Sequence, residues 1–218
     1  MERIPLAVRL KRESHRKIAY AQDLVLEQVY KSFNNAVLHG GTAIWRCFSG
    51  KRFSEDLDFY LENSKEKINS VFDNLEKIGF KIVKKKVSDT SVYSELEFDR
   101  VRVRLEAIFK KVSGILSDYE NSEGNTISIY SLSAEDFIKE KIETYLKRKK
   151  IRDLWDIYFL IKELKDISRI KKELSRLVKI YTPPIDEDNL KLIILEGITP
   201  TSREMFDYIR TKWEKENT

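Results

Sequence analysis

The chain has 218 residues, of which 41% are hydrophobic and 35% charged, so it can bury a substantial core, and its few Gly and Pro exclude a low-complexity chain. No apolar stretch approaches the roughly 18 residues of a membrane span, no signal-peptide pattern opens the chain, and the single cysteine excludes a disulfide framework. The formal net charge of +5 is a mild basic bias, compatible with a nucleic-acid or phosphate partner. We therefore expect a soluble, cytoplasmic protein.

The first part of the chain mixes helical and strand-like patterns. Helical spacing of apolar residues predicts three helices, over residues 15–32, 42–48 and 65–78. Short runs of β-like residues predict six strands, over residues 36–38, 57–61, 80–87, 92–98, 101–109 and 127–132. The fifth of these strands alternates clearly, with apolar residues on one face and charged residues on the other.

From Ser133 onward the pattern is helical. Five helices are predicted, over residues 134–148, 151–164, 168–180, 186–196 and 201–214. Prolines at positions 183, 184 and 200 separate the last of them. We therefore expect a mixed α/β domain over residues 1–132, followed by a helical domain over residues 133–218.

Two carboxylates, Asp56 and Asp58, lie two positions apart in a predicted strand. Side chains at that spacing share one face of a strand, about 7 Å apart at Cα, and could bind one or two hard divalent cations. A pair of surface acids at a solvated strand end would give the same pattern.

Gly40, Gly41 and Thr42 end one predicted strand and begin a helix. Such a turn exposes backbone N–H groups beside the positive end of a helix and can hold a triphosphate. An ordinary tight strand–helix turn would also use paired glycines.

Arg104 and Glu106 lie on the charged face of the strand predicted over residues 101–109. Glu106 could complete a metal site with three carboxylates, and Arg104 could contact a phosphate. The alternative is a half-exposed strand with cross-strand ion pairs.

Lys141 lies inside the apolar stripe of the helix predicted over residues 134–148. A lysine in that position needs a counter-charge, which Asp153 and Asp156 on the next helix can provide. The two acids could orient Lys141 or a substrate, or they could form a structural Lys–Asp–Arg network that locks two helices together.

Together these segments resemble the motifs of the nucleotidyl transferase AbiEii/AbiGii toxin family. That family has a glycine-rich turn before an R-x-S-x-D-hydrophobic-D strand, then a basic residue two positions before a carboxylate, an inward lysine and R-D-x-x-D. The matching segments here are Gly40–Ile44, Arg52–Phe59, Arg104–Glu106, Lys141 and Arg152–Asp156. The resemblance spans roughly residues 36–160. Many relatives have Lys and Asp in the second motif, where this chain has Arg and Glu.

The resemblance implies a polymerase-β-like nucleotidyltransferase domain over residues 1–132, including the N-terminal helix, and a C-terminal helical domain. It further implies that Asp56 and Asp58 hold Mg²⁺ or Mn²⁺, and that Glu106 completes the metal site and helps to deprotonate an acceptor hydroxyl. The reaction would transfer a nucleoside monophosphate from an NTP and release pyrophosphate.

The remaining motif residues are implied to bind the nucleotide. The glycine-rich turn, Gly40, Gly41 and Thr42, would hold the β- and γ-phosphates through backbone amides and a hydroxyl. Positive charge from Arg104 and Lys141 would offset phosphate charge in the transition state. The other candidate residues, which would shape the loop, contact phosphate or orient the lysine, are Arg52, Ser54, Asp153 and Asp156.

Relatives suggest the toxin of a toxin–antitoxin pair, with a cognate antitoxin as a possible partner and RNA, at the tRNA 3′ end, as the acceptor. Basic runs at residues 84–86, 110–111 and 147–150 could follow an RNA backbone or could be ordinary solvated faces. A protein hydroxyl is the second candidate acceptor. A non-catalytic NTP- or RNA-binding module that retains the fold is the alternative from another class.

Overall fold

A computed structural model describes residues 4–215 of the chain. The chain divides into two compact units, residues 1–132 (unit 1) and 133–218 (unit 2). Unit 1 combines a sheet with helices and unit 2 is helical, so the fold class expected from the sequence is confirmed. No helix in the described part of the chain is both long and apolar enough to cross a membrane.

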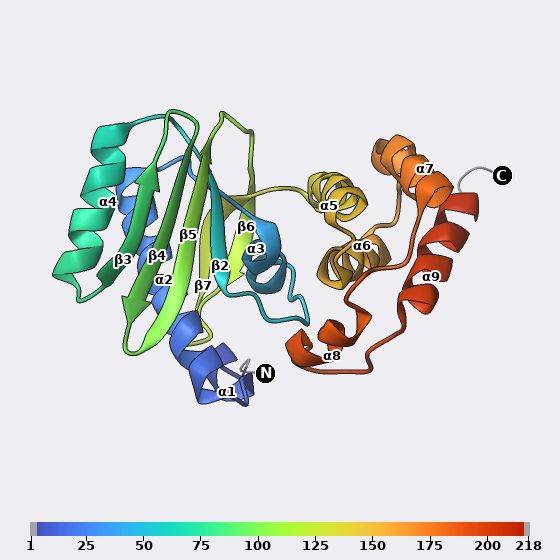
Figure 1. Cartoon of the computed structure of the whole chain (residues 1–218), viewed down its shortest axis with the longest axis horizontal. Helices are drawn as coiled ribbons and strands as arrows, with labels where there is room; N and C mark the ends of the chain where they lie inside the picture. Colours follow the sequence, from blue (N-terminus) through green and yellow to red (C-terminus); the bar gives the residue numbers. More distant parts are fainter. Residues whose placement is uncertain (1–3, 216–218) are drawn as a thin grey trace. The chain divides into compact units, whose positions relative to one another are not determined.

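The described part of unit 1, residues 4–132, contains four helices and a seven-stranded mixed sheet (Figure 1). The helices are α1 Leu6–Arg9, α2 Glu13–Ser32, α3 Gly40–Cys47 and α4 Lys65–Lys77. The strands are β1 Val37–His39, β2 Asp56–Leu61, β3 Lys81–Val87, β4 Ser91–Phe98, β5 Val101–Phe109, β6 Ile115–Glu120 and β7 Thr126–Ser131. Their order across the sheet is β3-β4-β5-β2-β1-β7-β6.

The central strand β2 sets the register of the candidate residues. It runs parallel to β5 and antiparallel to β1, with Asp56 opposite Arg104 and Asp58 opposite Glu106. Because residues opposite each other in a ladder point to the same side of a sheet, these four side chains share one face. The alternation predicted for β5 is confirmed, since the burial of its residues also alternates.

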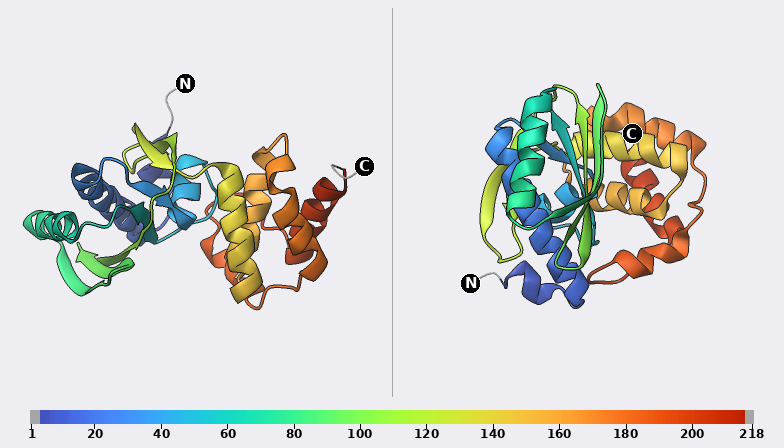
Figure 2. Two further views of the ribbon diagram at one scale, coloured as in Figure 1. Left: turned by 90° about the horizontal axis from the view of Figure 1, so that it is seen from above. Right: turned by 60° about the vertical axis from the view of Figure 1, so that its left-hand side comes forward.

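Helices α2 and α4 lie side by side and cover the other face of the sheet (Figures 1 and 2). The apolar residues of β2 are completely buried there, and the ring of Phe59 lies 6.2 Å from that of Tyr30 on α2. Helix α4 begins at a serine cap, Ser64, whose hydroxyl accepts a hydrogen bond from the Lys67 amide. This apolar packing fixes β2 from behind and leaves its carboxylates on the opposite face.

Unit 2 contains α5 Ala134–Arg148, α6 Ile151–Glu163, α7 Lys171–Ile180, α8 Leu190–Ile193 and α9 Ser202–Lys215, with short 3₁₀ turns at Ser168–Ile170 and Glu187–Asn189. Helix α5 packs against α6, and α6 packs against α9. The chain leaves α5 through Lys149 in a left-handed conformation (φ 51°), which turns it directly into α6. This tight connection keeps the facing sides of α5 and α6 together.

Three elements differ between the prediction and the structure. The four-residue helix α1, Leu6–Arg9, lies outside the predicted helices and is too short to show a helical period. Strand β6 has no counterpart in the sequence prediction because its burial does not alternate: Ile115 and Leu116 are exposed, whereas Tyr119 and Glu120 are buried. The helix predicted over residues 186–196 is reduced to a 3₁₀ turn and the four-residue α8. In that segment only Leu190 is buried, so no apolar stripe sustains a longer helix.

Candidate active site

The turn between β1 and α3 is built around Gly40. Its φ of +73° lies in the left-handed region, and a Cβ placed on it would lie 2.0 Å from Oδ2 of Asp58. No side chain fits there, so glycine lets the Asp58 carboxylate lie directly against the start of α3. The structure therefore brings the glycine-rich turn and the second carboxylate of β2 into contact.

The next glycine is packed against the R-x-S segment. A Cβ on Gly41 would lie 2.4 Å from Nη2 of Arg52 and 2.6 Å from Oγ of Ser54. Arg52 is almost completely buried, and its Nη1 donates to the carbonyl oxygen of Phe53 at 3.2 Å. Both predicted loop residues therefore pack around the turn, and the buried guanidinium fixes the loop that leads into β2.

Asp56 forms a bidentate ion pair with Arg104. Nε donates to Oδ1 at 2.6 Å and Nη2 to Oδ2 at 2.5 Å. These hydrogen bonds raise the pKa of Arg104 above its ordinary value, so the guanidinium is always charged. The pair is not sealed from solvent, because the side chain of Asp56 is 19% exposed and that of Arg104 is 43% exposed.

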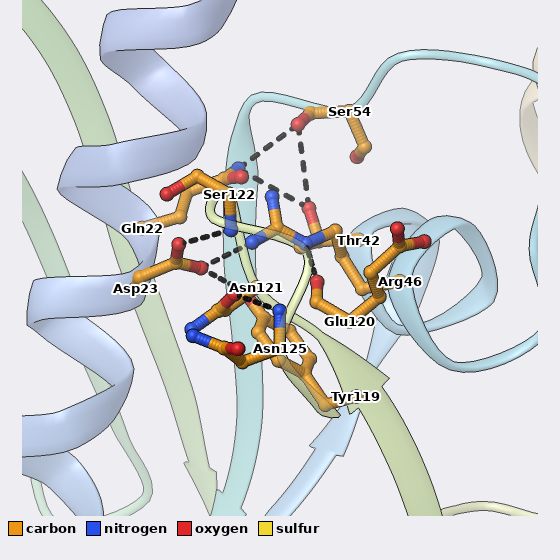
Figure 3. Close-up of polar contacts among 10 residues, drawn as sticks. All are labelled: Gln22, Asp23, Thr42, Arg46, Ser54, Tyr119, Glu120, Asn121, Ser122 and Asn125. Atoms are coloured by element: carbon orange, nitrogen blue, oxygen red, sulfur yellow. Dashed lines mark hydrogen bonds and ion pairs between the residues drawn. The ribbon is translucent and has the colours of Figure 1, made fainter. Parts of the chain in front are cut away.

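The hydroxyl of Thr42 is committed to the backbone of β2. Thr42 is completely buried, and its Oγ1 donates to the carbonyl oxygen of Asp56 at 2.5 Å. Gln22 on α2 donates from Nε2 to the carbonyl oxygen of Ser54 at 2.9 Å and lies 3.4 Å from Oγ1 of Thr42 (Figure 3). These contacts join the start of α3 to the start of β2.

Unit 2 contains the second group of predicted residues. Nζ of Lys141 lies 2.7 Å from Asp156 and 3.7 Å from Asp153. Arg148, in the last turn of α5, forms a bidentate pair with Asp153, with both N–O distances at 2.7 Å. Both acids have no exposed surface, so this is a buried network joining α5 to α6. The inward position predicted for Lys141 is observed.

A comparison with protein families identifies the chain. Residues 25–207 match the model of the nucleotidyl transferase AbiEii toxin of type IV toxin–antitoxin systems. The chain belongs to the AbiEii family. It is therefore a nucleotidyltransferase toxin, as its motifs predict. Among curated protein sequences, no match is found.

Three solved structures share the AbiEii fold of this chain. MenT4, a nucleotidyltransferase toxin from Mycobacterium tuberculosis H37Rv, is 17% identical, with a TM-score of 0.63 over 95% of this chain and 90% of that one. A putative nucleotidyltransferase from H. pylori is 21% identical, with a TM-score of 0.64 over 94% and 97%. JHP933 from Helicobacter pylori is also 21% identical, with a TM-score of 0.61 over 94% and 96%. At these identities the likeness concerns the fold.

AbiEii nucleotidyltransferases use an NTP and usually a divalent metal, so we asked whether the carboxylates of this site could bind a divalent cation. Asp56 and Asp58 fit one by donor type, because they are hard oxygen ligands on one strand face. Within residues 4–215, however, no three His, Cys, Asp or Glu side chains are grouped as a metal site. Asp56 and Asp58 thus fit a cation as a pair. Glu106 lies opposite Asp58 in the ladder but does not form a three-carboxylate group with them.

Two residues with direct contacts to the AbiEii motifs were not identified from the sequence. Gln22 belongs to no motif, and the only available signal is that a polar residue lies on the buried face of an amphipathic helix. Arg148 pairs with Asp153, whereas Arg152, the arginine of the R-D-x-x-D motif, is exposed. The helix break at Lys149 reverses the chain direction, and this reversal brings Arg148 back to the acid.

Proposed function

We propose that this AbiEii toxin transfers a nucleoside monophosphate from an NTP to an acceptor hydroxyl and releases pyrophosphate, using Mg²⁺ or Mn²⁺. The observation that carries the proposal is the contact between the Asp58 carboxylate and Gly40 at the start of α3. A cation held by Asp56 and Asp58 would therefore be adjacent to the positive end of a helix, where a triphosphate is favoured. When bound, this cation would offset the negative charge of the phosphates.

The residues of unit 1 then have distinct roles. Backbone amides of Gly40 and Gly41 bind phosphate oxygens, while the hydroxyl of Thr42 holds β2 in place. Arg104 neutralises Asp56 in the ligand-free protein and contacts phosphate in the complex, because guanidinium binds phosphate and carboxylate in the same bidentate way. Glu106 accepts the proton of the acceptor hydroxyl.

In unit 2, we propose Lys141 as a further catalytic residue, with Asp153 and Asp156 fixing its side chain. Support for this role comes from its distance of 2.7 Å to a completely buried carboxylate, which orients the ammonium group. A purely structural network would show the same contacts, and the two roles predict different effects of substitution, as described below.

RNA, at the tRNA 3′ end, is the acceptor that we propose. The edge strand β3 supports it, because its four lysines are all exposed and a polyanion would neutralise them: Lys81, Lys84, Lys85 and Lys86. RNA binding should then weaken steeply as salt rises, because each neutralised phosphate releases counterions. A flat salt response would exclude these lysines from acceptor binding.

The decisive experiment is a labelling assay with α-³²P NTPs. Each of the four NTPs is incubated with the protein and Mg²⁺, with and without total tRNA, alongside Asp58→Ala. We expect label to move to tRNA from one NTP and to be absent with the variant. Label on protein would identify a protein hydroxyl as the acceptor, and NTP binding without any transfer would indicate a non-catalytic binding module.

A further inference from the structure

Helix α3, which begins with the proposed phosphate turn, is held at both ends by two consecutive residues of α2. Gln22 contacts Thr42 in the first turn of α3, and Asp23 forms an ion pair with Arg46 in its last turn (Figure 3). Thr42 and Arg46 are four positions apart and therefore lie on the same side of α3. The helix is thus fixed in both position and rotation against α2.

We call these two contacts, Gln22–Thr42 and Asp23–Arg46, the α3 clamp. Its Arg46 end is a buried charge network. The Arg46 side chain has no exposed surface, and its guanidinium carbon lies 4.9 Å from the ring centre of Trp45 and 4.7 Å from that of Tyr119. Its Nε donates to the carbonyl oxygen of Glu120 at 2.6 Å, while Asp23 also accepts from the hydroxyl of Tyr119 at 2.8 Å. Breaking a buried ion pair is strongly destabilising, so this end of α3 is a rigid anchor to α2 and β6.

The Gln22 end is different because its hydrogen bonds link the segment that leads into β2 to the start of α3. One amide group contacts both the carbonyl oxygen of Ser54, just before β2, and the hydroxyl of Thr42. That hydroxyl in turn donates to the carbonyl oxygen of Asp56. A single completely buried side chain therefore sets the spacing between the glycine-rich turn and the strand that bears the two carboxylates.

We propose that Gln22 is a positioning residue of the nucleotidyltransferase site. It acts through Thr42 and the backbone at residues 54–56, and it fixes the distance between the phosphate turn and the carboxylate pair. The inference rests on the proposed function, since this distance matters only if phosphate and cation bind there. Displacing reacting groups by about 1 Å can lower a rate by about 100-fold, so the loss of one amide should reduce transfer far more than packing alone explains.

The test compares Gln22→Met with Gln28→Met. Gln28 lies on the same helix, is also buried (4% exposed) and has no role in the site described above, so the pair matches helix, burial and chemical change. We expect Gln22→Met to lower kcat by about tenfold or more, at a temperature where both variants are folded, and Gln28→Met to leave it unchanged. Equal rates for the two folded variants would overturn the proposal.

Thr42 provides a second pair that preserves packing. Thr42→Ser retains the hydroxyl and should retain transfer, whereas Thr42→Val has nearly the same shape without it and should lose transfer as Gln22→Met does. Because both residues belong to one chain of hydrogen bonds, the double variant Gln22→Met/Thr42→Val should be no slower than the worse single variant. Additive losses would show that the two residues act separately and would contradict the proposal.

Hydrogen exchange separates this proposal from the proposed function. Backbone amides over residues 40–44 and 54–58 should lose protection in Gln22→Met and keep it in Gln28→Met. If the unaltered protein transfers no nucleotide, the proposed function fails. The exchange result alone then tests whether Gln22 holds the glycine-rich turn against the start of β2. Unchanged protection in both segments would overturn the clamp even if transfer is observed.

Discussion

The two acid clusters of this molecule use the same chemistry in opposite surroundings. On β2 and β5, Asp56 pairs with Arg104 while both side chains keep contact with solvent. In unit 2, Asp153 and Asp156 pair with Lys141 and a second arginine while having no exposed surface. A half-exposed pair can exchange its partner for a ligand at low cost, whereas a buried one cannot be opened without leaving a desolvated charge. The first cluster is suited to binding, whereas the second holds α5 and α6 together and fixes the ammonium group of Lys141.

The sharpest test of this contrast is Asp58→Ala. Because its carboxylate faces the proposed nucleotide site rather than the core, we expect NMP transfer to fall by roughly 10³-fold or more with little change in melting temperature. The labelling assay and a thermal melt measure the two quantities. Asp89→Ala, at an exposed acid outside the site, is the control. Loss of folding in Asp58→Ala would remove the distinction between the two clusters.

In the buried cluster the effect should fall on stability. Asp153→Ala leaves Arg148 and Lys141 without their shared carboxylate, and we expect the free energy of unfolding to drop by about 4 kcal/mol. Urea denaturation measures the loss. The exposed Glu163 of α6 is the control site, where alanine should change stability by less than about 0.5 kcal/mol. Equally small losses of unfolding free energy at Asp153 and Glu163 would mean that burial does not make the second cluster more important for stability.

Lys141 decides whether the buried cluster has a role beyond stability. Lys141→Met should destabilise the fold by about 3 kcal/mol, because Asp156 is left buried without its cation. Replacing the whole pair, in Lys141→Met/Asp156→Leu, should restore the melting temperature since an apolar pair of similar size packs well. We expect transfer to stay low in this restored protein. Recovery of transfer together with stability would make Lys141 purely structural.

The smallest expected effect concerns Cys47, a partly buried residue outside both clusters. Burial raises the pKa of its thiol to about 12, whereas an unfolded thiol titrates near about 8.5. Above that lower value the unfolded chain has lost a proton that the native chain keeps, so stability falls as pH rises toward the native pKa. Each pH unit should remove at most about 1.4 kcal/mol. Cys47→Ala should reduce this slope in urea denaturations between pH 9 and 11, and an unchanged slope would contradict the assignment.

Elements with a clear periodicity could be predicted from the sequence. The alternation of β5 and the run around Asp56 and Asp58 indicate which face each side chain occupies, because strand geometry determines it locally. The inward position of Lys141 follows equally from helical spacing. These features depend only on residues close together in the chain, and the structure confirms each of them.

Contacts between distant segments could not be predicted in this way. Gln22 reaches Ser54 and Thr42 from another helix, and nothing in its neighbourhood marks it as different from Gln28 on the same helix. Strand β6 is equally invisible, since half of it is exposed and its two buried residues are adjacent. Both features arise from tertiary packing, which overrides local pattern.

The close contact between Gly40 and Asp58 offers a way to inactivate the protein without removing any charged side chain. One added methyl at this glycine collides with the carboxylate, so Gly40→Ala should silence the toxin while its basic and acidic surfaces stay as they are. Such a protein can be produced in growing cells and recovered with whatever its intact surfaces have captured. The inactive variant could therefore be used in affinity purification to identify the natural acceptor.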